Sequence, residues 1–286
     1  MQIVRYLEDG QPRLGQLVGD QIAPFPGMAE VQQLIAHWPN LPQTAASGGR
    51  VALESARLLA PIVPVRNIFC VGWNYLKHYD EGVGKREGQE VDLPSRPTFF
   101  TKLPTTVAGP YDPLPLHEDY TSKLDWEVEL AVIIGRQGRD ISREDALDYV
   151  FGYTVSNDIS ARDLQRAHGG QWFKGKSLDL TCPLGPMIVT ADELTDPQDL
   201  AVSCSVNEEM MQSSHTSRQI FDVRTVIAEL SAGLTLMPGD LILTGTPEGI
   251  GNARTPPVFL RHGDILTTTI ERLGSMHNLI QSKEGT

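Results

Sequence analysis

The chain has 286 residues, 40% of them hydrophobic, and a formal net charge of −12 at pH 7. The length gives room for one large domain or for a small domain beside a medium one, and the hydrophobic fraction excludes wholesale disorder. The acidic balance argues against nucleic acid or an anionic membrane as the main partner.

Cysteine usage and the N-terminus bear on location. The chain contains 3 cysteines, Cys70, Cys182 and Cys204, without CxxC spacing. An odd number is a poor disulfide framework, so we predict a reducing, cytoplasmic compartment. The first residues, MQIVRYLEDG, carry charges too early for a signal peptide. No apolar run approaches the roughly 20 residues of a membrane helix.

Residues 1–64 are predicted to form a small N-terminal α/β module. Short strands are expected over residues 2–25, with turns at Gly10, Gly15 and Gly19, and a short amphipathic helix over 31–38. A loop and the proline-bearing segment LLAPIVPVRN follow. We therefore place a domain boundary after residue 64 and assign residues 65–286 to the main domain.

The main domain is predicted to be rich in strands. Helices are expected over 142–150, where Ser142 is the N-cap and Asp145 completes a near capping box, and over 222–233. Strands are expected over 67–72, 97–103, 123–135, 151–158, 239–245, 263–274 and 276–281. This balance favours a strand-rich α+β or barrel-like fold over a doubly wound sheet. The polar, glycine-bearing segment 82–96 is long for a plain connection and is typical of a lid.

The segment KLDWEVELAVIIG, residues 123–135, carries acids along a strand that enters a core. Side chains alternate, so one face is apolar: Leu124, Trp126, Val128 and Leu130. The other face starts with three acids and then becomes apolar: Asp125, Glu127, Glu129, Ala131 and Ile133. Two interpretations are open. The acids form a solvated face at the outer end of the strand, or two of them bind a divalent cation, which favours oxygen ligands.

A cation site needs a third ligand, and Asp158 is the candidate. It ends the apolar strand GYTVSND just before the helix-like ISARDLQRAHGG. It could equally be a helix N-cap. Lys176 could meet the acids, because three carboxylates against one lysine and a divalent ion give a neutral cluster that a protein can bury. Residues 170–177 match the P-loop pattern, but no buried strand precedes them and prolines follow, so nucleotide binding is not favoured.

His78 and Glu81 are spaced i, i+3, so on one helical turn they face the same way. They form either a surface salt link or a general base in which the carboxylate holds the imidazole. The segment PGDLILTGTPEGIG, residues 238–251, is either a tight turn or a loop that holds a substrate carboxylate. The chain has no G-x-S-x-G elbow and no H-E-x-x-H zinc motif.

The order of these segments resembles the fumarylacetoacetate hydrolase family, in particular its bacterial acylpyruvase-like and 2-oxo-heptenedioate isomerase-like members. The segments that carry the resemblance are CVGWNYLKHYDE, PTFFTK, LDWEVELAVIIG, GYTVSNDISARDLQ, KGKSLDLTCPLGP and PGDLILTGTPEGIG. The match covers about residues 65–272. The resemblance implies a mixed β-roll catalytic domain, a short variable lead domain and a homodimer.

The resemblance also implies residue roles. Three carboxylates match the family's ligands for a divalent cation, Mg²⁺ or Mn²⁺, with Ca²⁺ able to replace it in crystals: Glu127, Glu129 and Asp158. The catalytic group is His78, Glu81 and Lys176, and the substrate contacts are Arg162, Gln165, Lys176 and Thr246. Asp125 is left as an outer or surface residue that is not a ligand.

The activity implied is hydrolysis of a C–C bond in an acylpyruvate-like or sugar-derived β-diketo acid, giving pyruvate and a carboxylic acid. His78, oriented by Glu81, would activate water. The alternative is an isomerase, decarboxylase or lyase that acts on a related 2-oxo acid through the same enolate. A binding protein without activity is disfavoured, because no acid of the set and neither residue of the His–Glu pair is missing.

Overall fold

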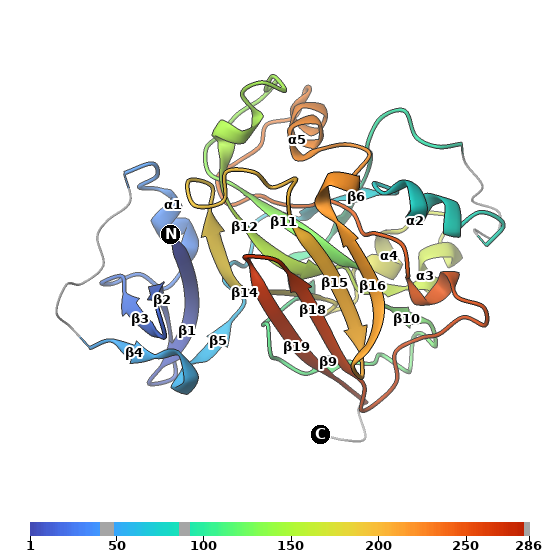
Figure 1. Cartoon of the computed structure of the whole chain (residues 1–286), viewed down its shortest axis with the longest axis horizontal. Helices are drawn as coiled ribbons and strands as arrows, with labels where there is room; N and C mark the ends of the chain where they lie inside the picture. Colours follow the sequence, from blue (N-terminus) through green and yellow to red (C-terminus); the bar gives the residue numbers. More distant parts are fainter. Residues whose placement is uncertain (41–48, 86–91, 283–286) are drawn as a thin grey trace.

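The computed structural model describes residues 1–40, 49–85 and 92–282, and these confirm a strand-rich α+β fold (Figure 1). Two mixed sheets hold most of the strands in the described residues. Helices in the described part are short: α1 Val31–Ile35, α2 Leu76–Glu81, α3 Arg162–Ala167, α4 Phe173–Lys176 and α5 Val223–Ser231. No helix in these ranges is long and apolar enough to span a bilayer.

The larger sheet has the strand order β4-β3-β2-β1-β14-β12-β11-β17-β6-β7, with β5 beside β1 and β8 beside β14. Its N-terminal strands are β1 Gln2–Glu8, β2 Gln11–Val18, β3 Gln21–Pro24, β4 Val51–Ala52 and β5 Arg57–Leu59. The others are β6 Ile68–Gly72, β7 Thr98–Lys102, β8 Val107–Ala108, β11 Val128–Ile134, β12 Val150–Asn157, β14 Cys182–Thr190 and β17 Leu241–Leu243. The N-terminal strands thus extend the larger sheet, because β1 pairs with β14, with Ile3 opposite Ile188.

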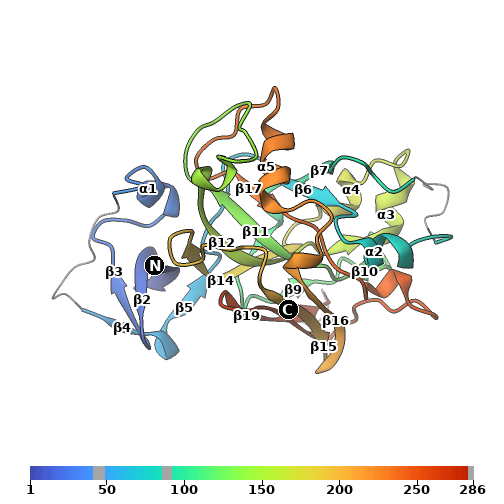
Figure 2. The same cartoon turned by 45° about the horizontal axis from the view of Figure 1, so that its top comes forward.

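The second sheet has the order β16-β15-β18-β19-β9 and packs against β11 and β12 (Figure 1). Its strands are β9 Leu114–Pro115, β15 Ala201–Val206, β16 Glu209–His215, β18 Ile265–Ile270 and β19 Gly274–Gln281. A separate pair joins β10 Leu124–Asp125 to β13 Ser160–Ala161. Figure 2 shows the N-terminal strands at one side of the molecule and α2, α3 and α4 at the other.

The central strand β11 is buried on both faces, so the acids that precede and begin it enter the interior with it. Val128, Leu130 and Val132 face the core under the second sheet. Ala131 and Ile133 face the core under the N-terminal strands, and Glu129 stands on their face of the strand. The solvated-face interpretation of the acids is therefore wrong.

Two predicted elements differ in the structure. The strand over 123–135 is interrupted at Trp126 and Glu127, because β10 pairs with β13 whereas β11 pairs with β12. The helix over 142–150 is reduced to a 3₁₀ turn, Ala146–Tyr149. The Ser142 hydroxyl does accept the Asp145 N–H at 3.1 Å. Arg224, however, donates to the carbonyls of residues 143 and 144, and β12 begins at Val150, so no helix propagates.

Candidate metal centre and active site

Glu127, Glu129 and Asp158 lie together in the interior. One carboxylate oxygen from each lies within 4.8 Å of the other two, and the residues are 4%, 2% and 0% exposed. The antiparallel register of β11 and β12 brings the start of one strand beside the end of the other, with Val128 opposite Asn157. The Asp158 N–H then donates to the Glu127 carbonyl at 2.8 Å.

Asp158 is not a helix N-cap. Helix α3 begins after Ala161, whose side chain caps nothing. Both Asp158 oxygens instead face ammonium groups: Lys176 Nζ lies 2.7 Å from Oδ2, and Lys102 Nζ lies 2.8 Å from Oδ1. The tertiary partners, not the local helix, therefore set the orientation of this carboxylate.

Buried cationic side chains neutralise the acids to different extents: Glu127 faces two of them, whereas Glu129 is left with a raised pKa. Lys176 Nζ donates to Glu127 Oε2 at 2.7 Å, and Arg162 Nη2 lies 2.6 Å from Glu127 Oε1. Burial alone would raise the pKa of Glu127, but Lys176 and Arg162 outweigh it and hold the pKa at about 2. The pKa of Glu129 is well above its usual range, because of burial and of the nearby Asp158 and Glu127 charges.

This cluster fits a hard divalent cation. All three converging ligand groups are carboxylates, the donors that Mg²⁺ and Mn²⁺ prefer. The crowding that raises the pKa of Glu129 is what a bound cation would relieve. The neutral cluster predicted from the sequence, with three carboxylates, Lys176 and a divalent ion, is incomplete. It left out three buried charged groups: Asp125, Lys102 and Arg162. Four carboxylates then face three cationic side chains, and a divalent ion would turn one excess negative charge into one excess positive charge.

The loop after β17 closes one side of the cluster. The Gly245 N–H donates to Glu129 Oε2 at 2.6 Å, at a φ of +95° that favours glycine. Thr246 is 2% exposed, and its hydroxyl accepts from Gln212 Nε2 at 2.9 Å. The Gln212 side chain also accepts the Val128 N–H at 3.0 Å, so β16 ties this loop to β11.

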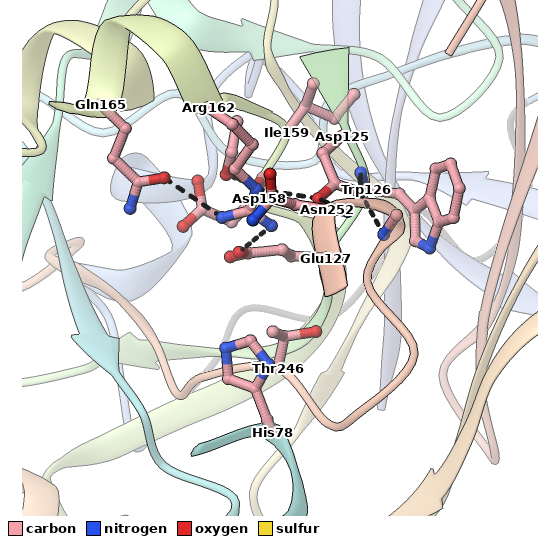
Figure 3. A network of polar contacts seen from close by, with 12 residues as sticks. His78, Asp125, Trp126, Glu127, Asp158, Ile159, Arg162, Gln165, Thr246 and Asn252 are labelled. Atoms are coloured by element: carbon pink, nitrogen blue, oxygen red, sulfur yellow. Dashed lines mark hydrogen bonds and ion pairs between the residues drawn. The ribbon is translucent and has the colours of Figure 1, made fainter. Parts of the chain in front are cut away.

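His78 and Glu81 form a partly buried pair on α2. His78 Nδ1 lies 2.9 Å from Glu81 Oε1, and Glu81 Oε2 accepts the Gly249 N–H at 2.8 Å. Their side chains are 11% and 20% exposed, so this is not a surface link. Because a carboxylate at Nδ1 favours a proton there, Nε2 is the nitrogen left to accept one. In the view of Figure 3, His78 and Thr246 lie on one side of Glu127, and Arg162 and Gln165 lie on the other.

One pocket joins the predicted residues. It is lined by His78, Glu127, Glu129, Arg162, Gln165, Lys176 and Thr246, while Glu81 and Asp158 support it from behind. Aromatic rings make a wall that the sequence did not indicate: the Trp172 ring lies 4.7 Å from Trp73 and 5.3 Å from Phe100. The lid predicted over 82–96 includes residues 86–91, which lie outside the described residues.

Sequence reasoning missed several supporting residues. Lys102 is 0% exposed and pairs with Asp158, and its signal is a lone lysine at the end of the apolar strand PTFFTK. Asn157 accepts the Glu127 N–H at 2.8 Å, next to a predicted ligand. Gln212 has no local signal, because its polar strand reads as surface. Asp125 was predicted to be an outer or surface residue, and of these two alternatives the surface one is wrong: it is 0% exposed, and its oxygens accept four hydrogen bonds.

The P-loop match is resolved by the same geometry. Helix α4 covers only Phe173–Lys176, and the Lys176 ammonium is held by Glu127 and Asp158. A P-loop lysine would instead project from the start of a longer helix toward phosphate.

The fold and the site define an enzyme whose pocket carries a buried carboxylate cluster and a His–Glu pair. The chain belongs to the fumarylacetoacetate hydrolase family: residues 67–281 match the family described as fumarylacetoacetate (FAA) hydrolase C-terminal. Residues 1–61 match a second family, described as Rv2993c-like, N-terminal. The boundary after residue 64 stays a prediction.

Relatives carry different activities in their names. The chain is 47% identical over 254 residues to oxaloacetate tautomerase YisK of Bacillus subtilis, covering 88% of this chain and 82% of that protein. It is 45% identical over 222 residues to the mitochondrial oxaloacetate tautomerase fahd2 of Xenopus laevis, covering 77% and 67%. The structure of a fumarylacetoacetate hydrolase from Exiguobacterium antarcticum matches with a TM-score of 0.87 at 40% identity, covering 99% and 100%.

Proposed function

We propose that this chain is a tautomerase that interconverts the enol and keto forms of an oxaloacetate-like 2-oxo acid. The observation that carries the proposal is that a His–Glu pair and a buried carboxylate–lysine cluster share one pocket. Proton transfer at a carbon beside a ketone needs a base on one side and positive charge beside the oxygen on the other. The sequence analysis ranks C–C hydrolysis first, but the names of the relatives at 45–47% identity favour its alternative, an isomerase.

The carboxylates Glu127, Glu129 and Asp158 would hold a divalent cation, which supplies Lewis-acid polarisation of the 2-oxo group. His78 Nε2 exchanges a proton with C3 of the substrate. Glu81 holds the Nδ1–H, fixes the tautomer and stabilises the imidazolium that forms. In the enol-to-keto direction the 2-hydroxyl loses one proton, C3 gains one, and the C2–C3 double bond becomes a C2–O double bond.

Lys176 supports the oxygen side of the reaction. Burial lowers the pKa of its ammonium, but the Asp158 and Glu127 carboxylates outweigh this and raise it, so Lys176 is charged at neutral pH. A fixed ammonium beside the 2-oxygen stabilises the negative charge that develops there and needs no reorganisation. Arg162, Gln165 and Thr246 line the same pocket and are assigned to substrate contact.

The test is a direct enol–keto assay. Loss of the enol absorbance of oxaloacetate is followed with Mn²⁺, and release of pyruvate is measured in the same samples. We expect tautomerisation well above the buffer rate, with little C–C cleavage. A rate equal to that of buffer with Mn²⁺ overturns the proposal.

Hydrolysis of an acylpyruvate is the second candidate. The His78–Glu81 pair could equally activate water, and the Exiguobacterium protein at 40% identity is named a hydrolase. Pyruvate formation from an acylpyruvate at a rate above oxaloacetate tautomerisation would favour this candidate.

Location and assembly complete the proposal. A cytoplasmic location is consistent with Cys70, Cys182 and Cys204, which are all free and buried. A homodimer is expected from the family resemblance, and light scattering on the purified chain would measure it.

A further inference from the structure

The loop of residues 245–252, here the glycine loop, presents its backbone N–H groups to three carboxylates with different roles. Gly245 donates to the proposed cation ligand, and Gly249 donates to the residue that orients the proposed base. Gly251 and Asn252 donate to a third carboxylate at 2.7 and 2.9 Å, and this is Asp125. One short segment thus contacts the metal side and the base side of the pocket.

Asp125 joins the far end of this loop to the cluster. Its Oδ2 also accepts Arg162 Nε at 2.8 Å, and Arg162 Nη2 lies 2.6 Å from Glu127 Oε1. Arg162 Nη1 donates to Gln165 at 3.2 Å, so three guanidinium nitrogens already contact protein groups. Figure 3 shows Asp125, Arg162 and Glu127 as adjoining members of one network with Asn252. Contacts of this kind hold the Arg162 guanidinium in a fixed position in the pocket lining.

The glycine loop can lie this close only because side chains are absent at its turns. A Cβ on Gly251 would lie 1.9 Å from the Val258 carbonyl oxygen and 2.8 Å from Asp125 Oδ1. Gly249 has a φ of +103°, and a Cβ there would lie 2.1 Å from the Met211 carbonyl oxygen. The backbone therefore has one narrow path past Asp125, and Asp125 is the acceptor that fixes it.

We propose that Asp125 is a positioning residue. It fixes the position of the glycine loop and of Arg162, and through them the positions of Glu127 and of the Glu81–His78 pair. The path runs from His78 through Glu81 and Gly249 along the loop, and from Asp125 through Arg162 to Glu127. The inference depends on the proposed function only for the measurement of turnover. Residues that orient cation ligands in this way typically change affinity or activity 10–100-fold when mutated.

Asp240 is a matched control for a purely structural aspartate. It is 2% exposed, accepts the Met237 N–H at 2.7 Å, and lies 3.4 Å from Arg66. It therefore also anchors a turn and faces an arginine, but the turn leads into β17 and contributes nothing to the pocket lining.

The experiment compares Asp125→Asn with Asp240→Asn in the full chain. An asparagine keeps the shape but replaces one acceptor oxygen of Asp125 with an NH₂ donor, which faces the donors of the loop or of Arg162. We measure Mn²⁺ affinity by calorimetry, hydrogen exchange of the peptide over 245–252, thermal unfolding, and turnover.

For Asp125→Asn we expect Mn²⁺ affinity and turnover to fall about 10- to 100-fold and exchange over 245–252 to quicken. For Asp240→Asn we expect a similar loss of thermal stability with Mn²⁺ affinity unchanged. Unchanged Mn²⁺ affinity and exchange in Asp125→Asn would overturn the proposal. Because these two readouts need no substrate, they decide about Asp125 even if the chain proves not to be a tautomerase.

A second pair covers the case in which Asp125→Asn does not fold. Asn252→Pro removes the N–H that donates to Asp125, in the first turn of the 3₁₀ helix Gly251–Ala253, where that N–H has no partner within the helix. Asn252→Ala removes the same side chain and keeps that N–H. We expect weaker Mn²⁺ binding in the proline variant than in the alanine variant, and equal binding in both would count against the role of Asp125.

Discussion

Lys102 shows how single residues hold this site together. It is fully buried, its ammonium lies 2.8 Å from Asp158 Oδ1, and it donates to the Ile159 carbonyl at 3.1 Å. The Lys102 charge is balanced by the Asp158 carboxylate, which also faces Lys176. Removing one partner of a buried pair leaves the other desolvated and unpaired, which is far costlier than losing a surface pair.

We therefore expect Lys102→Met to lower the free energy of unfolding by about 3 kcal/mol. Urea unfolding in the presence of a chelator measures it. Lys174→Met, on the exposed face of α4, is the control and should change stability by less than about 0.5 kcal/mol. Equal losses in the two variants would show that the buried pair is not what stabilises this region.

His78 is predicted to act on protons and not on the cation. His78→Ala leaves Glu127, Glu129, Asp158 and Lys176 in place, so Mn²⁺ affinity should be retained. Tautomerisation should fall roughly 10²-fold or more, as expected when a general base is lost. Glu81→Gln should act in the same direction, since it weakens the support of the Nδ1–H. Steady-state rates and calorimetry on both variants give the comparison, and full activity in His78→Ala would place the base elsewhere.

At the scale of elements, helix α5 is ordered by its own cap. The Asp222 side chain accepts the Thr225 N–H at 2.8 Å and pairs with Arg143. Burial would raise the pKa of Asp222, but the hydrogen bonds from Thr225 and the charge of Arg143 outweigh it and lower the pKa. A lowered folded-state pKa means that the stabilisation is present above the unfolded pKa, about 3.9, and is lost as the pH falls through the folded value.

Asp222→Ala should therefore cost about 1 kcal/mol of unfolding free energy at pH 7, a typical value for an N-cap. The difference between wild type and variant should shrink as the pH falls from about 4 through the lowered folded-state pKa, because the unfolded chain binds the proton first and the folded carboxylate is protonated only at lower pH. Urea unfolding at several pH values tests this, and a difference that stays constant with pH would contradict the role of the charge.

The elements also show what sequence can and cannot predict. Strands β6, β12 and β17–β19 and helix α5 follow from local patterns, because most of their apolar residues are buried in a core. Strand β7 also follows from its sequence, although its Phe99 is exposed and its buried residue is Lys102. Strand β14 was not predicted, since CPLGPMIVT contains two prolines and a glycine, and it is held by its neighbours β1 and β12. Polar β16 likewise depends on pairing with β15.

The same division holds in the site. The resemblance named Glu127, Glu129, Asp158 and Lys176, and the structure brings them together. The role of Asp125 could not be predicted, because its partners Gly251 and Asn252 are more than 120 residues away and only the fold brings them near.

At the scale of the whole molecule, the carboxylate cluster sits where several segments meet. Glu127 and Glu129 belong to the β10–β11 segment, Asp158 follows β12, and the loop after β17 closes over Glu129. Without a cation this junction holds one more carboxylate than cationic side chains, buried in the middle of the larger sheet. A divalent ion held there by Glu127, Glu129 and Asp158 would offset that excess negative charge.

Cation binding should for this reason stabilise the fold as a whole. A ligand at 100 times its Kd, bound by the folded state alone, adds about 2.7 kcal/mol. For a chain of this size that corresponds to a rise in Tm of about 5 °C or more. Thermal unfolding of chelator-treated protein with and without Mn²⁺ measures it, with Glu127→Gln expected to abolish the rise and the exposed Glu144→Gln to retain it. The same rise in Glu127→Gln would mean that Mn²⁺ acts at another place, and no rise in the wild type would mean that the buried acids hold no cation.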